Sequence, residues 1–394
     1  MSNPYRKTLT ACYLGFITQA ITANFAPLLF MTFYRSYGIA FGVLALIPTC
    51  FFFTQLIVDL LCALFLKKRG YRAAVIASSA ASAAGLAGLA FLPELLPSPF
   101  VGILLCVLVY AVGSGLIEVL GSPIVEAIPA GNKAARMSLL HSFYCWGSVG
   151  VIAVSTLFLA LFGAEHWRPL ALLWALIPLC NIVNFALCPI PAAEDESDGL
   201  RPAALLTNKT FWLLTALMLC AGASELSMAQ WAYAFAESAL HISKTAGDLV
   251  GPCGFAVCMG LSRVIFAKQG DKPDLTVYMT VSAVLCVGCY LLAALSGLPV
   301  FGLIGCTLCG FTVGIMWPGS ITLSAAALPA GGTALFAFLA LAGDLGGTVG
   351  PALVGTLSQS AGNDLRFGLL FGLIFPLGLL ACVLTLRRKR QQNR

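Results

Sequence analysis

Six charged side chains stand inside long apolar stretches of this sequence: Asp59, Glu118, Glu126, Glu225, Arg263 and Asp344. A charged side chain at the centre of a membrane costs about 2.5–3.5 kcal/mol on insertion scales, so residues of this kind usually serve a function. A carboxyl group in poorly hydrated surroundings can hold a proton near neutral pH. These residues therefore predict the binding of a proton or of a polar solute.

The apolar stretch 99–127 carries a polar residue at every fourth position, namely Ser114, Glu118, Ser122 and Glu126. This spacing places all four on one slowly drifting stripe of a helix. We expect Glu118, well inside the stretch, to bind a coupling cation or the solute; a structural hydrogen bond is the alternative. Glu126 lies near the end of the stretch and is expected to cap the helix or to act at a gate.

Parts of the chain recur with an offset of 200 residues. Pro129-Ala130-Gly131 recurs as Pro329-Ala330-Gly331, and Gly147-Ser148-Val149-Gly150 recurs as Gly347-Thr348-Val349-Gly350. Two similar halves, both mostly apolar, are typical of membrane transporters that hold their substrate between the halves.

The offset also suggests a partner for Glu118. Its equivalent position in the second half falls at Trp317 and Pro318. Pro318 should kink its helix. Trp317 would then face Glu118, and an aromatic ring opposite a carboxyl group suits a sugar; an ordinary packed tryptophan is the alternative.

The stretch 136–162 presents a second polar face, formed by Ser138, His141, Tyr144, Cys145 and Ser148. The offset brings Tyr144 onto Asp344. We interpret Asp344 either as a coupling carboxylate or as a hydrogen-bonding residue that joins its helix to the helix at 41–66. His141 is either a packing residue or a proton relay.

The stretch 210–237 contains Glu225, Gln230 and Trp231. Glu225 and Gln230 would leave a continuous helix about 140° apart, at 100° per residue. Both can point into one cavity only if the helix unwinds, as helices often do at transporter sites. Gln19 and Asn24, in the first apolar stretch, are further hydrogen-bonding candidates for the solute.

We group the candidates by role. The expected solute-binding residues are Gln19, Asn24, Glu118, Tyr144, Glu225, Gln230, Trp231 and Trp317. The expected proton-coupling residues are Glu118, Glu225 and Asp344. The expected gating residues are Asp59, Glu126, His141, Arg263, Gly147 and Gly347, the two glycines because they allow close and smooth helix contact.

The elements that must position these residues are membrane-spanning helices. Hydrophobic residues make up 59% of the chain and charged residues 10%, whereas a soluble domain carries about 25% charged residues. A helix needs roughly 20 apolar residues to cross a membrane. We predict an all-α membrane protein with twelve such helices near 9–33, 41–66, 73–93, 99–127, 136–162, 168–189, 210–237, 246–267, 274–296, 299–328, 332–359 and 366–386.

Six helices fall in each half, which predicts a bundle at 1–189, a polar linker at 190–209 and a second bundle at 210–394 with a basic tail. Lys and Arg gather in the connections that share a side with both termini, so the termini and the linker are expected in the cytoplasm. The net charge of +6 then reflects orientation in the membrane and does not predict nucleic-acid binding. The expected location is the plasma membrane, which is the inner membrane in a cell that has two membranes.

The chain has 15 cysteines, and two pairs, Cys286/Cys289 and Cys306/Cys309, have the spacing of zinc ligands. All of them fall inside expected spans, where small residues serve helix packing. We therefore expect no metal and no cofactor.

The layout resembles the major facilitator superfamily. Gly70 and Arg72 fit the family's loop motif after the second helix, although Lys67 stands where the motif has aspartate. The contexts of Glu118 and of Glu225 with Gln230-Trp231 are similar to the fucose–proton symporter group. The resemblance implies that helices 1, 4, 7 and 10 line a central cavity and that the halves alternate in access.

We therefore expect a secondary transporter, a proton- or sodium-linked symporter of a small polar organic solute, first a sugar, working as a monomer. Efflux of amphipathic compounds, or a transporter-like sensor without flux, are the alternatives. No G-x-x-x-x-G-K-[ST] motif is present in the sequence, so ATP is not expected to drive it directly. The sequence shows no set of nucleophile and base that would indicate an enzyme.

Overall fold

The computed structural model describes residues 5–39, 41–44, 46–65, 70–129, 132–191, 202–240, 251, 253–269, 274–296, 298–361 and 365–392, with the backbone alone over 230–240. The described residues form helices and contain no strand. Nine of these helices are long and apolar enough to cross a membrane, and Leu46–Cys62 is a shorter apolar helix. The fold is thus that of an all-α, multi-pass membrane protein, as predicted, and every expected span contains helix within the described ranges.

The chain divides into two compact units, unit 1 with residues 1–129 and 143–199, and unit 2 with residues 130–142 and 200–394. The division after Gly199 falls inside the expected linker, most of which lies outside the described residues. The division after Ser142 falls within one helix, α8 (Lys133–Phe162), whose first turns belong to unit 2.

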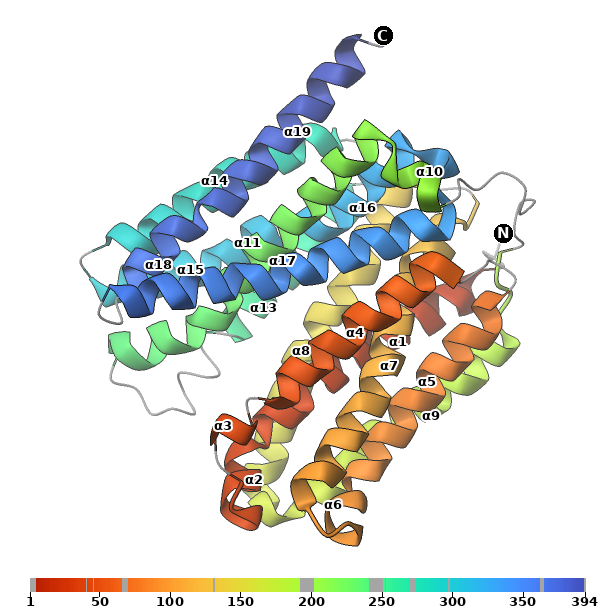
Figure 1. Ribbon diagram of the computed structural model, residues 1–394, viewed down its shortest axis with the longest axis vertical. Coiled ribbons are helices and arrows are strands. Elements are labelled where there is room, and N and C mark those ends of the chain that lie inside the picture. Colours follow the sequence, from red (N-terminus) through yellow and green to blue (C-terminus); the bar gives the residue numbers. More distant parts are fainter. Residues whose placement is uncertain are drawn as a thin grey trace. The chain divides into compact units, whose positions relative to one another are not determined.

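Unit 1 is built around α7, which packs against α1, α4 and α5, while α9 packs against α1 and α5 (Figure 1). Glycines on α5 and α7 let these two helices approach closely; a Cβ at Gly85 would lie 2.7 Å from the carbonyl oxygen of Cys106. The unit also contains the later part of α8. Its other elements are α1 (Arg6–Leu28), α2 (Phe30–Tyr37), α3 (Phe41–Leu44), α4 (Leu46–Phe65), α5 (Tyr71–Leu89), α6 (Leu92–Leu95), α7 (Pro99–Glu126), η2 (Ala164–His166) and α9 (Trp167–Leu187).

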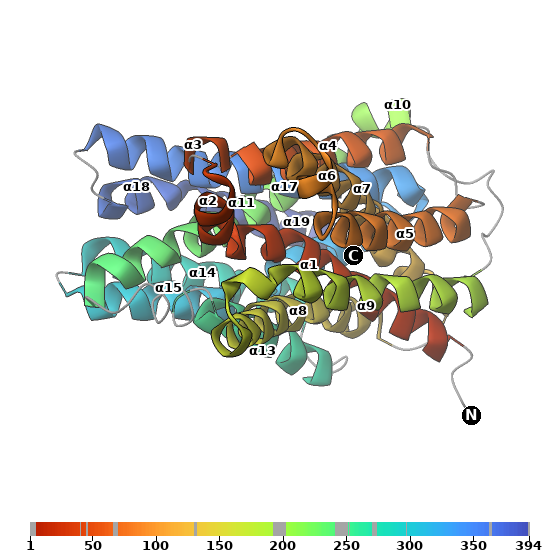
Figure 2. The same ribbon diagram turned by 90° about the horizontal axis from the view of Figure 1, so that it is seen from below.

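Unit 2 is built around α11, which packs against α15, α16, α17 and α19, and α14 packs against α15 and α19 (Figures 1 and 2). Besides the start of α8, its elements are α10 (Pro202–Leu206), α11 (Lys209–Leu240), α13 (Gly254–Gln269), α14 (Leu275–Leu295), α15 (Pro299–Val313), α16 (Met316–Ala327), η5 (Pro329–Gly331), α17 (Gly332–Ser360), α18 (Leu365–Gly372) and α19 (Ile374–Gln392).

Two expected spans of unit 2 are each divided just before a proline. Pro318 is the third residue of α16, and Pro376 is the third residue of α19. A proline has no N–H for the carbonyl four residues earlier, and its ring crowds that carbonyl. The expected kink at Pro318 is therefore present as a break that separates α15 from α16.

The loop that suggested the family motif is described from Gly70 onward, and Lys67 lies outside the described residues. Arg72, at the start of α5, donates to the carbonyl oxygens of Phe185 (3.0 Å), Ala186 (2.7 Å) and Cys188 (2.9 Å). The last carbonyls of a helix lack partners within it and carry its negative end. Arg72 thus caps α9 and ties the two helices together.

Candidate functional site

The carboxylate of Glu118 lies at the meeting point of three helices of unit 1. Its Oε2 accepts hydrogen bonds from the side-chain amides of Gln19 on α1 (2.8 Å) and Gln55 on α4 (3.0 Å). The Gln55 amide also lies 3.2 Å from the hydroxyl oxygen of Ser114, one turn before Glu118 on α7. We call these four residues the amide cluster.

Small residues on α7 allow the other two helices to come this close. A Cβ at Gly115 would lie 3.1 Å from Cβ of Val58 on α4, and the ring of Phe16 on α1 occupies the space beside Gly121. The glutamines are nearly fully buried, with 8% of Gln19 and 3% of Gln55 exposed, whereas Glu118 is half-buried. The amide cluster therefore holds one carboxylate, which has buried hydrogen-bond donors on one side and is partly exposed on another.

A second polar contact in unit 1 involves Asn24, also on α1. Its side-chain amide donates to the carbonyl of Ala20 (2.8 Å) and to the hydroxyl of Ser148 on α8 (3.3 Å). Asn24 and Gln19 thus connect α1 to two different neighbours. Both remain candidates for hydrogen bonds to a solute.

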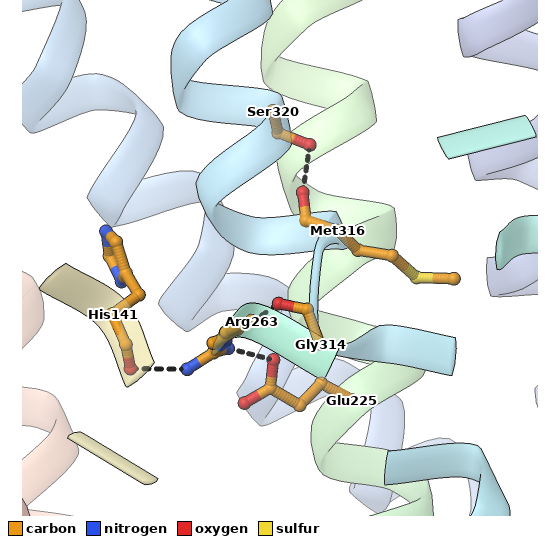
Figure 3. Close-up of polar contacts among 6 residues, drawn as sticks. All are labelled: His141, Glu225, Arg263, Gly314, Met316 and Ser320. Carbon is orange, nitrogen blue, oxygen red and sulfur yellow. Dashed lines mark hydrogen bonds and ion pairs between the residues drawn. The ribbon is translucent and has the colours of Figure 1, made fainter. Parts of the chain in front are cut away.

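The centre of the polar contacts in unit 2 is Arg263 on α13 (Figure 3). Its guanidinium donates to the carbonyl of Gly314 (2.7 Å), to the carbonyl of His141 (2.8 Å) and to Oε2 of Glu225 on α11 (3.3 Å). The hydroxyl of Ser138 donates to the main-chain carbonyl of Arg263 (2.8 Å). One residue therefore joins α8, α11, α13 and the break between α15 and α16.

The contact with Gly314 follows from the position of Pro318. The carbonyl of Gly314 is four residues before the proline, so the helix supplies it with no N–H donor. The Nε of Arg263 takes that place. The break is thus stabilised by a charged donor from a neighbouring helix.

Glu225 and Arg263 form a buried ion pair, with 3% of the Arg263 side chain and 11% of the Glu225 side chain exposed. A buried pair offsets its desolvation only when further hydrogen bonds satisfy both partners. The two main-chain carbonyls supply such bonds to the guanidinium. The sequence indicated both residues, but it gave them separate roles and did not predict that they pair.

The expected polar face of α8 is divided between the two units. Ser138 and His141 belong to unit 2 and contact Arg263, whereas Ser148 belongs to unit 1 and contacts Asn24. The contact of His141 with Arg263 is made by its main-chain carbonyl. Tyr144, between them, is half-buried.

The remaining candidates lie on other elements. Asp59 is fully buried on α4, Asp344 is 8% exposed on α17, and Glu126 is the half-buried last residue of α7. The ring of Trp317 is half-buried and covers Gly343, beside Asp344. The contact of Trp317 with Gly343 lies within unit 2. The pairing of Trp317 with Glu118 therefore stays a prediction.

Helix α11 runs without interruption from Lys209 to Leu240. The unwinding that would let Glu225 and Gln230 point into the same cavity is therefore absent from this helix. Gln230 and Trp231 lie on this helix, but their side chains are outside the described residues.

The glycines near Asp344 serve contacts inside unit 2. A Cβ at Gly346 would overlap the backbone of Leu219, one at Gly350 would lie 2.9 Å from the carbonyl of Ala223, and Gly347 faces the side chain of Leu226, all on α11. Gly147 likewise lies against Ile17 on α1, within unit 1. These contacts lie between neighbouring helices of one unit, and the gating role expected of Gly147 and Gly347 stays a prediction.

Gln55 is the residue of the amide cluster that the sequence analysis missed. The available signal was a neutral polar residue in the apolar stretch 41–66, one turn before Asp59. An uncharged amide stands out less in an apolar stretch than a charged side chain does.

Among the cysteines, Cys286 on α14 and Cys309 on α15 have sulfur atoms 3.8 Å apart. The described residues contain no group of three or more His, Cys, Asp or Glu side chains placed to hold a metal ion.

The fold and its buried polar residues define a multi-pass membrane transporter. The family model of the Major Facilitator Superfamily matches residues 11–335 and 238–394, and the chain belongs to this family. No curated protein sequence matches it significantly.

Solved structures share the fold at low sequence identity. The E. coli fucose:proton symporter is 17% identical, with a TM-score of 0.80, covering 97% of this chain and 99% of that one. A proton:xylose symporter is 13% identical, with a TM-score of 0.79, covering 98% and 96%. The human organic anion transporter MFSD10 is 17% identical, with a TM-score of 0.72, covering 97% and 99%.

Proposed function

We propose that this transporter is a proton-coupled symporter of a small neutral polyhydroxy solute, in the first place a sugar, and that Glu118 binds the proton. The observation that carries the proposal is the pair of buried amides that donate to a single oxygen of Glu118 inside the membrane region. A half-buried carboxylate held in this way can take up a proton, and its surroundings can bind hydroxyl groups.

The contacts of the other carboxylate support the choice of Glu118 over Glu225. Glu225 is paired with Arg263, so its charge is already compensated within the protein. Neutralising it with a proton would leave a buried guanidinium without its partner, which is unfavourable. Glu118 accepts from two amides, which impose no such penalty when a proton arrives.

The relatives with the same fold make a sugar the first solute to test, since two of them are described as a fucose:proton and a proton:xylose symporter. Gln19 and Asn24 on α1, Tyr144 on α8 and Trp317 on α16 remain the proposed solute-binding residues. The amide groups and the aromatic rings would match the hydroxyl edges and the apolar faces of a sugar.

The test is uptake of radiolabelled L-fucose, D-xylose and D-glucose into proteoliposomes, with a proton gradient, with a sodium gradient and with none. We expect a proton gradient to drive accumulation of at least one sugar. Accumulation of none of them, together with lowered retention of an amphipathic dye by cells that make the protein, would instead favour efflux of amphipathic compounds.

Glu118→Gln is the decisive variant. Glutamine keeps the size and hydrogen bonding of the residue but cannot titrate, so we expect gradient-driven accumulation to disappear while counterflow exchange persists. If both activities survive unchanged, Glu118 is not the coupling group, and Asp344 becomes the stronger candidate.

A further inference from the structure

The position of Gln55 suits a second role besides hydrogen bonding to Glu118. Its amide N–H group lies within hydrogen-bond distance of two acceptors, the Oε2 of Glu118 (3.0 Å) and the hydroxyl oxygen of Ser114 (3.2 Å), both on α7. Residue Gln55 is 3% exposed, whereas Glu118 is half-buried. Gln55 therefore reaches from the buried side of the cluster toward a carboxylate that other molecules can approach.

The two glutamine donors share one carboxylate oxygen, with Gln19 at 2.8 Å from the same Oε2. Hydrogen bonds to a charged acceptor are roughly twice as strong as those to a neutral one. When Glu118 takes a proton from the water and becomes a neutral carboxyl group, both bonds weaken. The amides then become available to another acceptor at little cost.

We propose that Gln55 hands its amide from Glu118 to the solute: it donates to the carboxylate in the proton-free state and to a solute hydroxyl once Glu118 is protonated. The inference rests on the proposed function of Glu118. It assigns a solute-binding and specificity role to a residue of α4, and it gives a physical reason why proton and solute bind together. Ser114, as the second acceptor, holds the Gln55 amide in place.

The handover predicts a direct effect of Gln55 on solute affinity that persists when residue 118 carries no charge. Gln55→Met keeps the length of the side chain and removes the donor. We expect the KM for counterflow of the transported sugar to rise about tenfold, the effect of one lost hydrogen bond, with the maximal rate within about twofold of the original.

The same change is then made in Glu118→Gln protein, which imitates the protonated state. If Gln55 binds the solute, the KM rises about tenfold in this background too. If Gln55 acts only by holding the Glu118 carboxylate, the change has no effect here, and the proposed handover is wrong.

Thr54→Val is the matched control. Thr54 is the neighbour of Gln55 on α4, and its hydroxyl donates to the carbonyl of Cys50 in the same helix (2.7 Å). The KM of the Thr54→Val variant should equal that of the original protein. Should Gln55→Met fail to fold, Gln55→Asn decides the question, because its amide falls one methylene short; an unchanged KM in that variant would overturn the inference.

The outcomes separate the inference from the proposed function. Absence of sugar uptake by the unaltered protein refutes the proposed function and the inference with it. Proton-driven uptake that Glu118→Gln uncouples, combined with an unchanged KM in the Gln55 variants, refutes the inference alone.

Discussion

At the scale of single residues, the carboxylates Glu118 and Glu225 of this transporter have different hydrogen-bonding partners. Glu225 is neutralised by Arg263, whose other N–H groups are used by two main-chain carbonyls. Glu118 receives amide donors from Gln19 and Gln55. The first arrangement favours a fixed charge pair that joins helices, and the second is the arrangement on which the proposed proton coupling rests.

The pairing of Glu225 with Arg263 predicts a non-additive effect on stability. Arg263→Met leaves a buried carboxylate without its cation and should lower the free energy of unfolding by about 3–5 kcal/mol. Adding Glu225→Gln should restore part of that loss, because the stranded charge is gone. Thermal unfolding of the purified single and double variants in detergent measures this. Additive losses would mean that the two side chains do not act as a pair.

At the scale of helices, glycine spacing and proline position decide how α11, α16 and α17 fit together. The close contact of α17 with α11 needs residues without a Cβ at Gly346 and Gly350. The break before α16 needs an outside donor for the Gly314 carbonyl, and Arg263 provides it. Both features belong to unit 2.

The repeat offers a matched pair of substitutions for this contact. Gly150 and Gly350 occupy equivalent positions, but a Cβ at Gly150 meets nothing within 4 Å, whereas one at Gly350 would lie 2.9 Å from the carbonyl of Ala223. Gly150→Ala should be neutral or stabilising by up to about 1 kcal/mol, since alanine favours helix. Gly350→Ala should destabilise, as seen by a lower melting temperature in detergent. Equal melting temperatures would contradict the proposed role of this contact.

At the scale of the whole molecule, the chain is a transporter of the major facilitator superfamily, and alternating access of two halves around a central site is the mechanism that we propose for it. The orientation in the membrane is a separate prediction. It rests on the basic residues at the termini and in alternate connections, which are expected to stay in the cytoplasm.

Cysteine labelling tests this orientation. In a variant stripped of its native cysteines, a membrane-impermeant maleimide should not reach Asp198→Cys in intact cells and should reach it after permeabilisation. Ser98→Cys, in a connection expected on the outer side, is the control and should react in intact cells. Labelling of position 198 from outside would reverse the predicted topology.

The sequence by itself determined the class of protein, the approximate spans of the helices and the identity of the buried charged residues. These properties are local: composition decides that a segment can enter a membrane, and spacing decides which residues share a helix face. The stripe with Ser114 and Glu118 followed from spacing alone, and both residues accept from the same Gln55 amide.

Only the tertiary structure decided which of these residues meet. Gln55 and Glu118 are 63 positions apart, and Glu225 and Arg263 are 38 apart. Their pairing depends on the rotation and depth of each helix against its neighbours, which side-chain periodicity does not specify. The partner of the Gly314 carbonyl could not be read from the sequence for the same reason: Pro318 predicts that the carbonyl is left without a helix donor, but the packing of α13 decides that Arg263 supplies one.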